Sequence, residues 1–177
     1  MDIPMQTPCT EKSPIEMAAR DLFDFAVDRE DIKAVMVALH PNAQTPRQTI
    51  EYELAILKII SVGWSLAYFL EHSPHKLALA ENFWAAIREF SQTVSATTAL
   101  MTGQEIDYFQ VLKDRLNSYV TAMNEKPEAK EPAVVMGPEF ARTCGHADDV
   151  FAVMTGARLF IATIGSVKAY LEEVKLR

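Results

Sequence analysis

The sequence predicts an all-α fold, a compact bundle of five or six helices. Apolar residues recur at spacings of three and four along most of the chain, and no segment shows the strict alternation of a half-buried strand. All nine prolines fall outside the long apolar stretches, and several stand directly behind a Ser or Thr. A Ser or Thr hydroxyl caps the first turn of a helix, and proline fits the first helical position, so these pairs mark helix starts.

The helices of the first half are expected between such signals. Ser13-Pro14-Ile15-Glu16 has the spacing of a capping box, and a break at residues 28–31 separates the helix it opens from a second segment, residues 32–39. Thr45-Pro46 is expected to cap the longest apolar helix, which runs to Leu70. Because this helix is apolar on most sides, we expect it at the centre of the bundle.

The second half predicts helices of more ordinary amphipathicity. Ser73-Pro74 precedes a helix over residues 74–101, and Thr102-Gly103-Gln104-Glu105 predicts a further capping box before a helix that ends near Met123. A short helix is expected after Pro138, ending near Gly145, and a final one from about Asp148 to Lys175.

The chain is predicted to hold a single domain. Its 177 residues suffice for one sizeable core. Residues 1–12 are polar and contain two prolines, so a flexible tail is expected there, followed by one helical domain over residues 13–177. Residues 124–137 are rich in Pro, Glu and Lys and predict a solvated linker between two helical groups.

Charge and targeting signals bound the surroundings of the protein. The net charge is −7 and the cations are scattered singly, which disfavours binding to nucleic acid or to an anionic membrane surface. The first residues lack a basic region followed by an apolar core, so no secretory signal is predicted and a cytoplasmic location is expected. Cys9 and Cys144 are expected to be free thiols.

Two apolar runs, residues 54–70 and 151–167, raise the question of membrane spans. Each is at the short limit for a span and carries a cation near its middle, Lys58 or Arg158. Such a cation costs about 2.5–3.5 kcal/mol at a bilayer centre. We therefore expect core helices, with each cation either paired to an acid such as Glu53 or Asp107 or extended to the surface.

No constellation for catalysis or cofactor binding stands out. His72 and His75 straddle a helix junction, and Cys144 and His146 stand two residues apart, which does not place them on one helical face. The Glu-x-x-His pair of di-iron bundles is absent, as are phosphate-binding loops and nucleophile elbows. The expectation is a protein that is not an enzyme and has no metal or cofactor.

A partner surface is the leading functional expectation: a homo-oligomer contact or a groove for an amphipathic partner helix. The hydroxyl-rich stretch Ser91–Thr102 is either part of such a surface or an exposed face whose hydroxyls bond to their own helix. The residues expected to line the groove are Phe83, Ile87, Phe90, Val94, Phe109, Leu112 and Leu116.

A second functional hypothesis is a small apolar or amphipathic ligand enclosed in the bundle. Aromatic side chains would form its wall, and a cation would meet its polar end. The residues expected to form that site are Lys58, Trp64, Tyr68, Trp84 and Arg158.

Residues 45–123 carry several sequence features in common with one known family. They are Thr45-Pro46-Arg47 followed by Glu51-Tyr52-Glu53-Leu54, a helix containing Trp64, and the stretch from Thr97 to Gly103 before another amphipathic helix. In these features the chain resembles the flagellar biosynthesis regulator FlaF. The resemblance implies a small, helical, non-enzymatic protein linked to flagellin production or secretion through a helical partner.

Overall fold

The computed structural model describes residues 13–176, so the predicted tail over residues 1–12 lies outside the described residues. The described part confirms the all-α prediction. It contains seven helices, two of which divide the N-terminal segment at the predicted break. The helices are α1 (Pro14–Val27), α2 (Glu30–Val37), α3 (Arg47–Phe69), α4 (Lys76–Thr102), α5 (Tyr108–Asn124), α6 (Ala133–Thr143) and α7 (Val150–Glu173).

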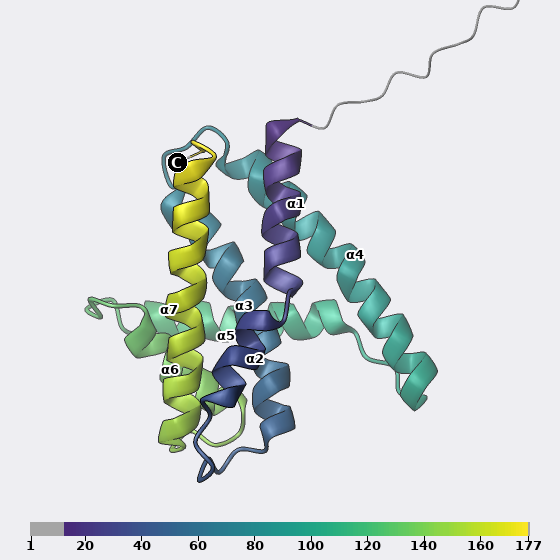
Figure 1. Ribbon diagram of the computed structural model, residues 1–177, viewed down its shortest axis with the longest axis vertical. Helices are drawn as coiled ribbons and strands as arrows, with labels where there is room; N and C mark the ends of the chain where they lie inside the picture. Colours follow the sequence, from purple (N-terminus) through teal and green to yellow (C-terminus); the bar gives the residue numbers. More distant parts are fainter. Residues whose placement is uncertain (1–12, 177) are drawn as a thin grey trace, which may run out of the picture.

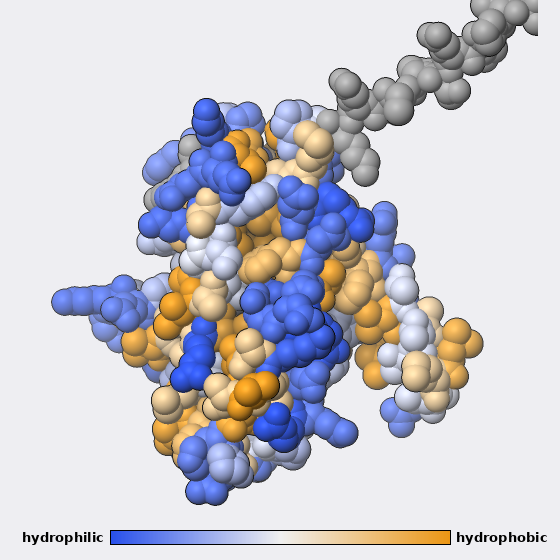
Figure 2. All heavy atoms as spheres, in the orientation of Figure 1, coloured by the Kyte–Doolittle hydropathy of each residue, from blue (hydrophilic) through white to orange (hydrophobic). Residues whose placement is uncertain are grey.

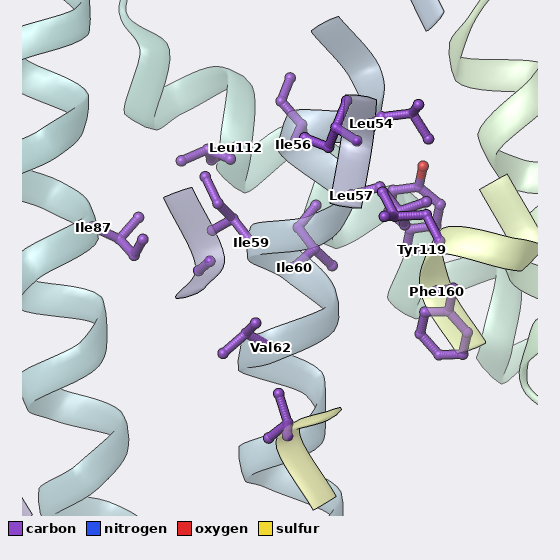
Figure 3. Close-up of a cluster of buried hydrophobic side chains, with 14 of the residues drawn as sticks. Leu54, Ile56, Leu57, Ile59, Ile60, Val62, Ile87, Leu112, Tyr119 and Phe160 are labelled. Carbon is purple, nitrogen blue, oxygen red and sulfur yellow. The ribbon is translucent and has the colours of Figure 1, made fainter. Parts of the chain in front are cut away.

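Helix α3 lies at the centre, as its all-round apolar sequence predicts. Its side chains leave in opposite directions: Ile59 lies on the side of Ile87 and Leu112, and Leu57 on the side of Tyr119 and Phe160 (Figure 3). All six of these side chains are buried. One continuous core therefore joins α3 to the helices on both sides of it.

The other helices pack around α3 in two groups. Helix α7 packs on α3 and α6, while α1 packs on α3 and α4 (Figure 1). Helices α6 and α7 approach closely at Gly156, where a Cβ atom would lie 2.5 Å from the ring of Phe140. Helix α4 runs diagonally, and its C-terminal end leaves the body of the molecule (Figure 1).

The helix starts follow the sequence signals only in part. Ser13 and Glu16 form the predicted capping box. At α4 the cap position is His75, with Ser73 accepting a hydrogen bond from its amide, and at α5 the cap is Asp107 rather than Thr102. Gly103 adopts the left-handed conformation that ends α4, so Thr102 belongs to that helix and cannot start the next.

Thr45 does not cap α3, because its hydroxyl is used elsewhere. It donates to the carboxylate of Asp149, which caps α7, and the cap position of α3 is Pro46, without a side-chain bond. The same carboxylate also accepts from the amides of Gln44, Thr45, Phe151 and Ala152. The residue predicted to cap α3 thus links the segment before α3 to the first turn of α7.

The predicted linker extends too far, because α6 begins at Ala133 and not after Pro138. Pro132 occupies the cap position of α6, and Pro138 lies inside the helix with its side chain exposed. Of the two prolines, the earlier one marks the helix start. The apolar stretch of residues 133–136, expected to be part of a loop, forms the first turn of α6.

Two helices are long and apolar enough to cross a membrane, α3 and α7. Of the most apolar window of α3, 67% is buried in the protein, against 39% in α7. Core packing accounts for the composition of α3. Helix α7 keeps apolar residues on its outer face, and the sequence-based expectation that neither helix spans a membrane stays a prediction.

Candidate functional site

Three turns of α4 extend beyond the core. The buried residues of α4 end at Ser91, and the following residues, 92–103, here called the arm, are exposed or only half-buried. Leu100 and Met101 near its end are 88% and 81% exposed. Figure 2 shows the apolar atoms of this projecting end on the right of the molecule.

Four of the five hydroxyl groups of the arm bond to their own helix, and the fifth, that of Thr97, belongs to an exposed side chain. Thr93, Ser95, Thr98 and Thr102 each donate to the carbonyl oxygen four residues earlier, as Ser91 does at the base of the arm. The oxygen of Ser95 also accepts from the amide of Tyr108. Side chains bonded in this way do not need water, so their methyl and methylene groups can be covered without loss of a hydrogen bond. Of the two readings of this stretch, self-bonding is confirmed, and it is compatible with a partner surface.

The arm carries no charged side chain. Between Glu89 and Glu105, residues 90–104 contain no Asp, Glu, Lys or Arg. A solvent-facing helix of a soluble protein ordinarily shows a charged face opposite its apolar one. A neutral, projecting helix with apolar residues at its end is instead typical of a surface that another molecule covers.

A hollow of about 390 Å³ lies at the base of the arm. Its wall combines the end of α1, the start of α2, the first half of α3, the middle of α4 and the start of α5. The lining residues are Ala26, Val27, Arg29, Ile32, Gln48, Glu51, Tyr52, Ala55, Ile59, Phe90, Val94 and Tyr108.

The hollow has an apolar floor and a polar edge. Tyr52 and Phe90 each meet the ring of Tyr108 edge-on, at 6.4 Å between centroids. The edge is formed by Arg29 and Glu51, paired at 2.5 Å with both side chains about half exposed. Burial raises the pKa of Tyr52 and of Tyr108, so both hydroxyls remain protonated donors at neutral pH. Within the described residues the Tyr108 hydroxyl makes no hydrogen bond.

The predicted groove residues fall into two groups. Phe83, Ile87 and Leu112 are fully or almost fully buried in the core. The prediction that these three side chains line an open groove is therefore wrong. Phe90 and Val94 line the hollow. Leu116 and Phe109 are half-buried, and the guanidinium of Arg88 lies 5.1 Å from the Phe109 ring centroid.

The residues predicted to enclose a ligand do not form one cavity. Trp64 stacks on Tyr68, with 4.7 Å between ring centroids, and also meets Phe160. The ring of Trp84 fills the space over Gly63, and Arg158 is exposed on α7. The predicted wall is therefore used for packing, and the hollow lies elsewhere.

Lys58 is the remaining member of that predicted site, and it is fully buried. Its ammonium donates to the carbonyl oxygen of Asp28 at 2.9 Å, lies 3.0 Å from the Asp31 carboxylate, and sits 4.3 Å above the Phe25 ring. Neither surface extension nor pairing with Glu53 occurs. Residue 53 lies on another side of α3, where it accepts two hydrogen bonds from Arg115. Lys58 thus holds the bend between α1 and α2.

The histidines and the cysteine considered for a metal or thiol site do not meet. His72 and His75 lie in the α3–α4 connection, whose Ser73 donates to the carbonyl of Leu176 after the end of α7, whereas Cys144 and His146 precede the start of α7. A helix of that length separates its ends by about 36 Å. Over residues 13–176, no three metal-ligating side chains gather. Burial raises the pKa of the Cys144 thiol to about 12, which leaves it protonated and unreactive at neutral pH.

Comparison with known proteins gives no relative: no family model, no curated protein and no solved structure matches this chain.

Sequence reasoning missed the part of the site that comes from α1, α2 and α3. Arg29, Glu51 and Tyr52 belong to segments far from the predicted groove, and only the fold brings them together. One signal was available in the sequence: the interval without charge, residues 90–104, can be read directly and coincides with the arm.

Proposed function

We propose that this protein is a non-enzymatic helical interaction protein that binds a helix through the arm and the hollow at its base. The observation that carries the proposal is the neutral, projecting arm with its exposed apolar end. A partner helix laid along the arm would cover Leu100 and Met101 and place an apolar side chain in the hollow. Such helix-in-groove binding relies on a few anchors at helical spacing.

The polar edge of the hollow supports the same proposal. Arg29 and Glu51 neutralise each other, and within residues 13–176 the Tyr108 hydroxyl donates to no other side chain or carbonyl. A partner residue entering the hollow would therefore meet apolar walls and one hydrogen-bond donor, with little net charge to desolvate. Anchors of this kind carry most of the binding energy in helix-binding proteins.

A photo-crosslinking amino acid at Leu100, introduced in living cells of the natural host, tests this proposal. Val37 provides a matched control, because it is 86% exposed but lies on α2, away from the arm. We expect a discrete crosslinked product from position 100 and none from position 37. Mapping the crosslinked peptide identifies the bound helix. Absence of any product from position 100 would contradict the proposed function.

The resemblance to FlaF stays a prediction and gives the proposal a biological setting. If it holds, the helix crosslinked at position 100 belongs to a protein of flagellin production or secretion. Deleting the gene in a flagellated host would then change the amount of flagellin made or secreted. An unchanged amount, with the crosslink intact, would separate the protein from flagellin while preserving its interaction role.

The ligand hypothesis survives in a relocated form. The hollow is within the size range of small-molecule sites, is mostly apolar, and is lined by the phenol of Tyr108. An amphipathic molecule could occupy it in place of a partner side chain. Native mass spectrometry of the purified protein distinguishes the two: extra mass of a small organic molecule supports a ligand, whereas the bare chain mass or a multiple of it favours the interaction role.

A further inference from the structure

We infer that the helix bound by the arm is α4 of a second copy of this chain, paired antiparallel about Thr97. This inference rests on the proposed function and names its partner. It starts from one stripe of residues on α4, formed by Phe83, Ile87, Phe90, Val94, Thr97 and Met101 at spacings of three and four.

The two halves of this stripe are treated differently by the fold. Phe83 and Ile87 are fully buried against the core, and Phe90 and Val94 pack at its edge. Thr97 and Met101 continue the same face beyond the body and are exposed. The apolar face of α4 thus extends beyond the helices that cover it. Its last turns carry an apolar face that packs against no other helix.

Antiparallel pairing makes the exposed half of the stripe self-complementary. With the two-fold axis between residues 97 and 98, position 94 of one copy lies opposite position 101 of the other. Each Met101 then meets the partner's Val94, at the mouth of the hollow, and the two Thr97 side chains lie beside the axis. The Met101–Val94 contact occurs twice, as contacts between different residues do in a two-fold symmetric interface, and the Thr97–Thr97 contact occurs once.

Charge favours a second copy over a charged partner. The protein carries a net charge of −7, so most faces of two copies repel each other. Residues 90–104 carry no charge, and the edge of the hollow is neutralised by the Arg29–Glu51 pair. The arm itself therefore adds no like charge to a contact between two acidic molecules, and the acidic side chains Glu105 and Asp107 lie at its flank, beside Gln92 and Ser95. Antiparallel pairing also places the two acidic bodies at opposite ends of the paired arms.

Complementary charge variants test the pairing. Met101→Glu and Val94→Lys should each be monomeric, because each places two charges against apolar atoms in a homodimer, and we expect the dissociation constant to rise by about a hundredfold. Mixed together, the two variants should form a heterodimer, since one Glu–Lys pair and one Val–Met contact then face each other. The matched control is Met101→Glu mixed with Val94→Glu, which should stay monomeric.

The measurement is sedimentation equilibrium of the full chain, with the heterodimer identified by native mass spectrometry. Circular dichroism and thermal unfolding of each variant check that the fold persists. If Val94→Lys fails to fold, Thr97→Cys in a Cys9→Ser background provides the second test. Mild oxidation should link Thr97→Cys chains as dimers, and Gln92→Cys, exposed on another side of the arm, should not link.

Each outcome bears on the inference. Dimers of the unaltered chain, rescue by mixing and crosslinking through residue 97 support it. A monomer at every soluble concentration overturns it, as does dimerisation that Met101→Glu leaves unchanged. A crosslink from position 100 to a different protein, with the chain itself monomeric, overturns the second copy and leaves the proposed function standing.

Discussion

At the scale of single residues, Asp149 caps α7 and also binds the segment that precedes α3. It is almost fully buried, and its two oxygens accept five hydrogen bonds, from Thr45 (amide and hydroxyl) and the amides of Gln44, Phe151 and Ala152. The sequence shows Asp148-Asp149 before an apolar run, which predicts a cap for α7. Its second role could not be predicted, because Thr45 is 104 positions away.

Replacing Asp149 by alanine should destabilise the protein by roughly 2–4 kcal/mol, because one cap is lost and several buried donors lose their acceptor. Urea unfolding followed by circular dichroism measures this loss. Asp148→Ala is the matched control. The Asp148 side chain is exposed, so the free energy of unfolding of this variant should stay within about 0.5 kcal/mol of that of the original protein. Equal losses in the two variants would contradict the role assigned to Asp149.

Asp149 also predicts a dependence of stability on pH. Burial alone would raise its pKa, but the hydrogen bonds from Thr45, Ala152 and Gln44 outweigh burial and hold the pKa below its ordinary value. The stabilisation is therefore complete above the unfolded-state pKa of about 4 and is lost as the pH falls further. Unfolding free energies measured from pH 6 downward should decline less steeply in Asp149→Ala than in the original protein.

Lys58 offers a second test at this scale. Its buried stem packs against the core, while the carboxylate it pairs with is half exposed. Lys58→Met keeps most of that packing and leaves Asp31 hydrated, so we expect a loss of about 1–2 kcal/mol; Lys58→Ala adds a cavity and should cost roughly 2–4 kcal/mol. Calorimetric unfolding compares them. If the alanine variant were no less stable than the methionine one, packing of the stem would not matter.

At the scale of elements, α7 contains two glycines with opposite roles. Gly156 allows the ring of Phe140 to lie against the helix, whereas a Cβ at Gly165 would meet open space. Gly156→Ala should cost about 1–3 kcal/mol through overpacking between α6 and α7. Gly165→Ala should gain about 0.5–1 kcal/mol from helix propensity. Thermal unfolding of both variants checks the contrast, and a shift in the same direction would contradict it.

Helix existence was predictable, and helix starts were less so. The spacing of apolar residues indicates α3 and α7 clearly, because a three-four repeat is a local property. Thr45 and Thr102 have the local pattern of caps, but the first donates to a distant carboxylate and the second bonds back to Thr98. Such competition between partners is decided by tertiary structure, which local spacing does not contain.

At the scale of the whole molecule, stability should be unevenly distributed. Helix α3 is surrounded by core, while the arm beyond Ser91 lacks a neighbour on most sides. Hydrogen exchange measured by mass spectrometry should therefore show the slowest amides in α3 and the fastest helical amides in residues 96–103. If two copies pair through the arm, its exchange should slow as the protein concentration rises, whereas that of α3 should not change.

The candidate site was half predictable. The stripe on α4 and the run of hydroxyls were visible in the sequence, and Phe90 and Val94 prove to line the hollow. Phe83, Ile87 and Leu112 lie on the same periodic faces but are buried. Their burial could not be predicted, because the periodicity of a helix does not show where along its length the core ends. That boundary, after Ser91, depends on the helices packed against α4 and is not a property of its own sequence.

The tie between Thr45 and Asp149 also constrains the order in which the chain can be completed. On a ribosome, Thr45 emerges long before Asp149, and until then the start of α3 lacks the acceptor for its buried hydroxyl and amide. Ser73 likewise lacks its acceptor, the carbonyl oxygen of Leu176, until residue 176 has been synthesised. Helices made early can form, but the connections that precede α3 and α4 gain these bonds only after α7 has been made. The helix ends at Thr45 and Ser73 should therefore become stable only after residues 149 and 176 have been synthesised, and not as each helix is made.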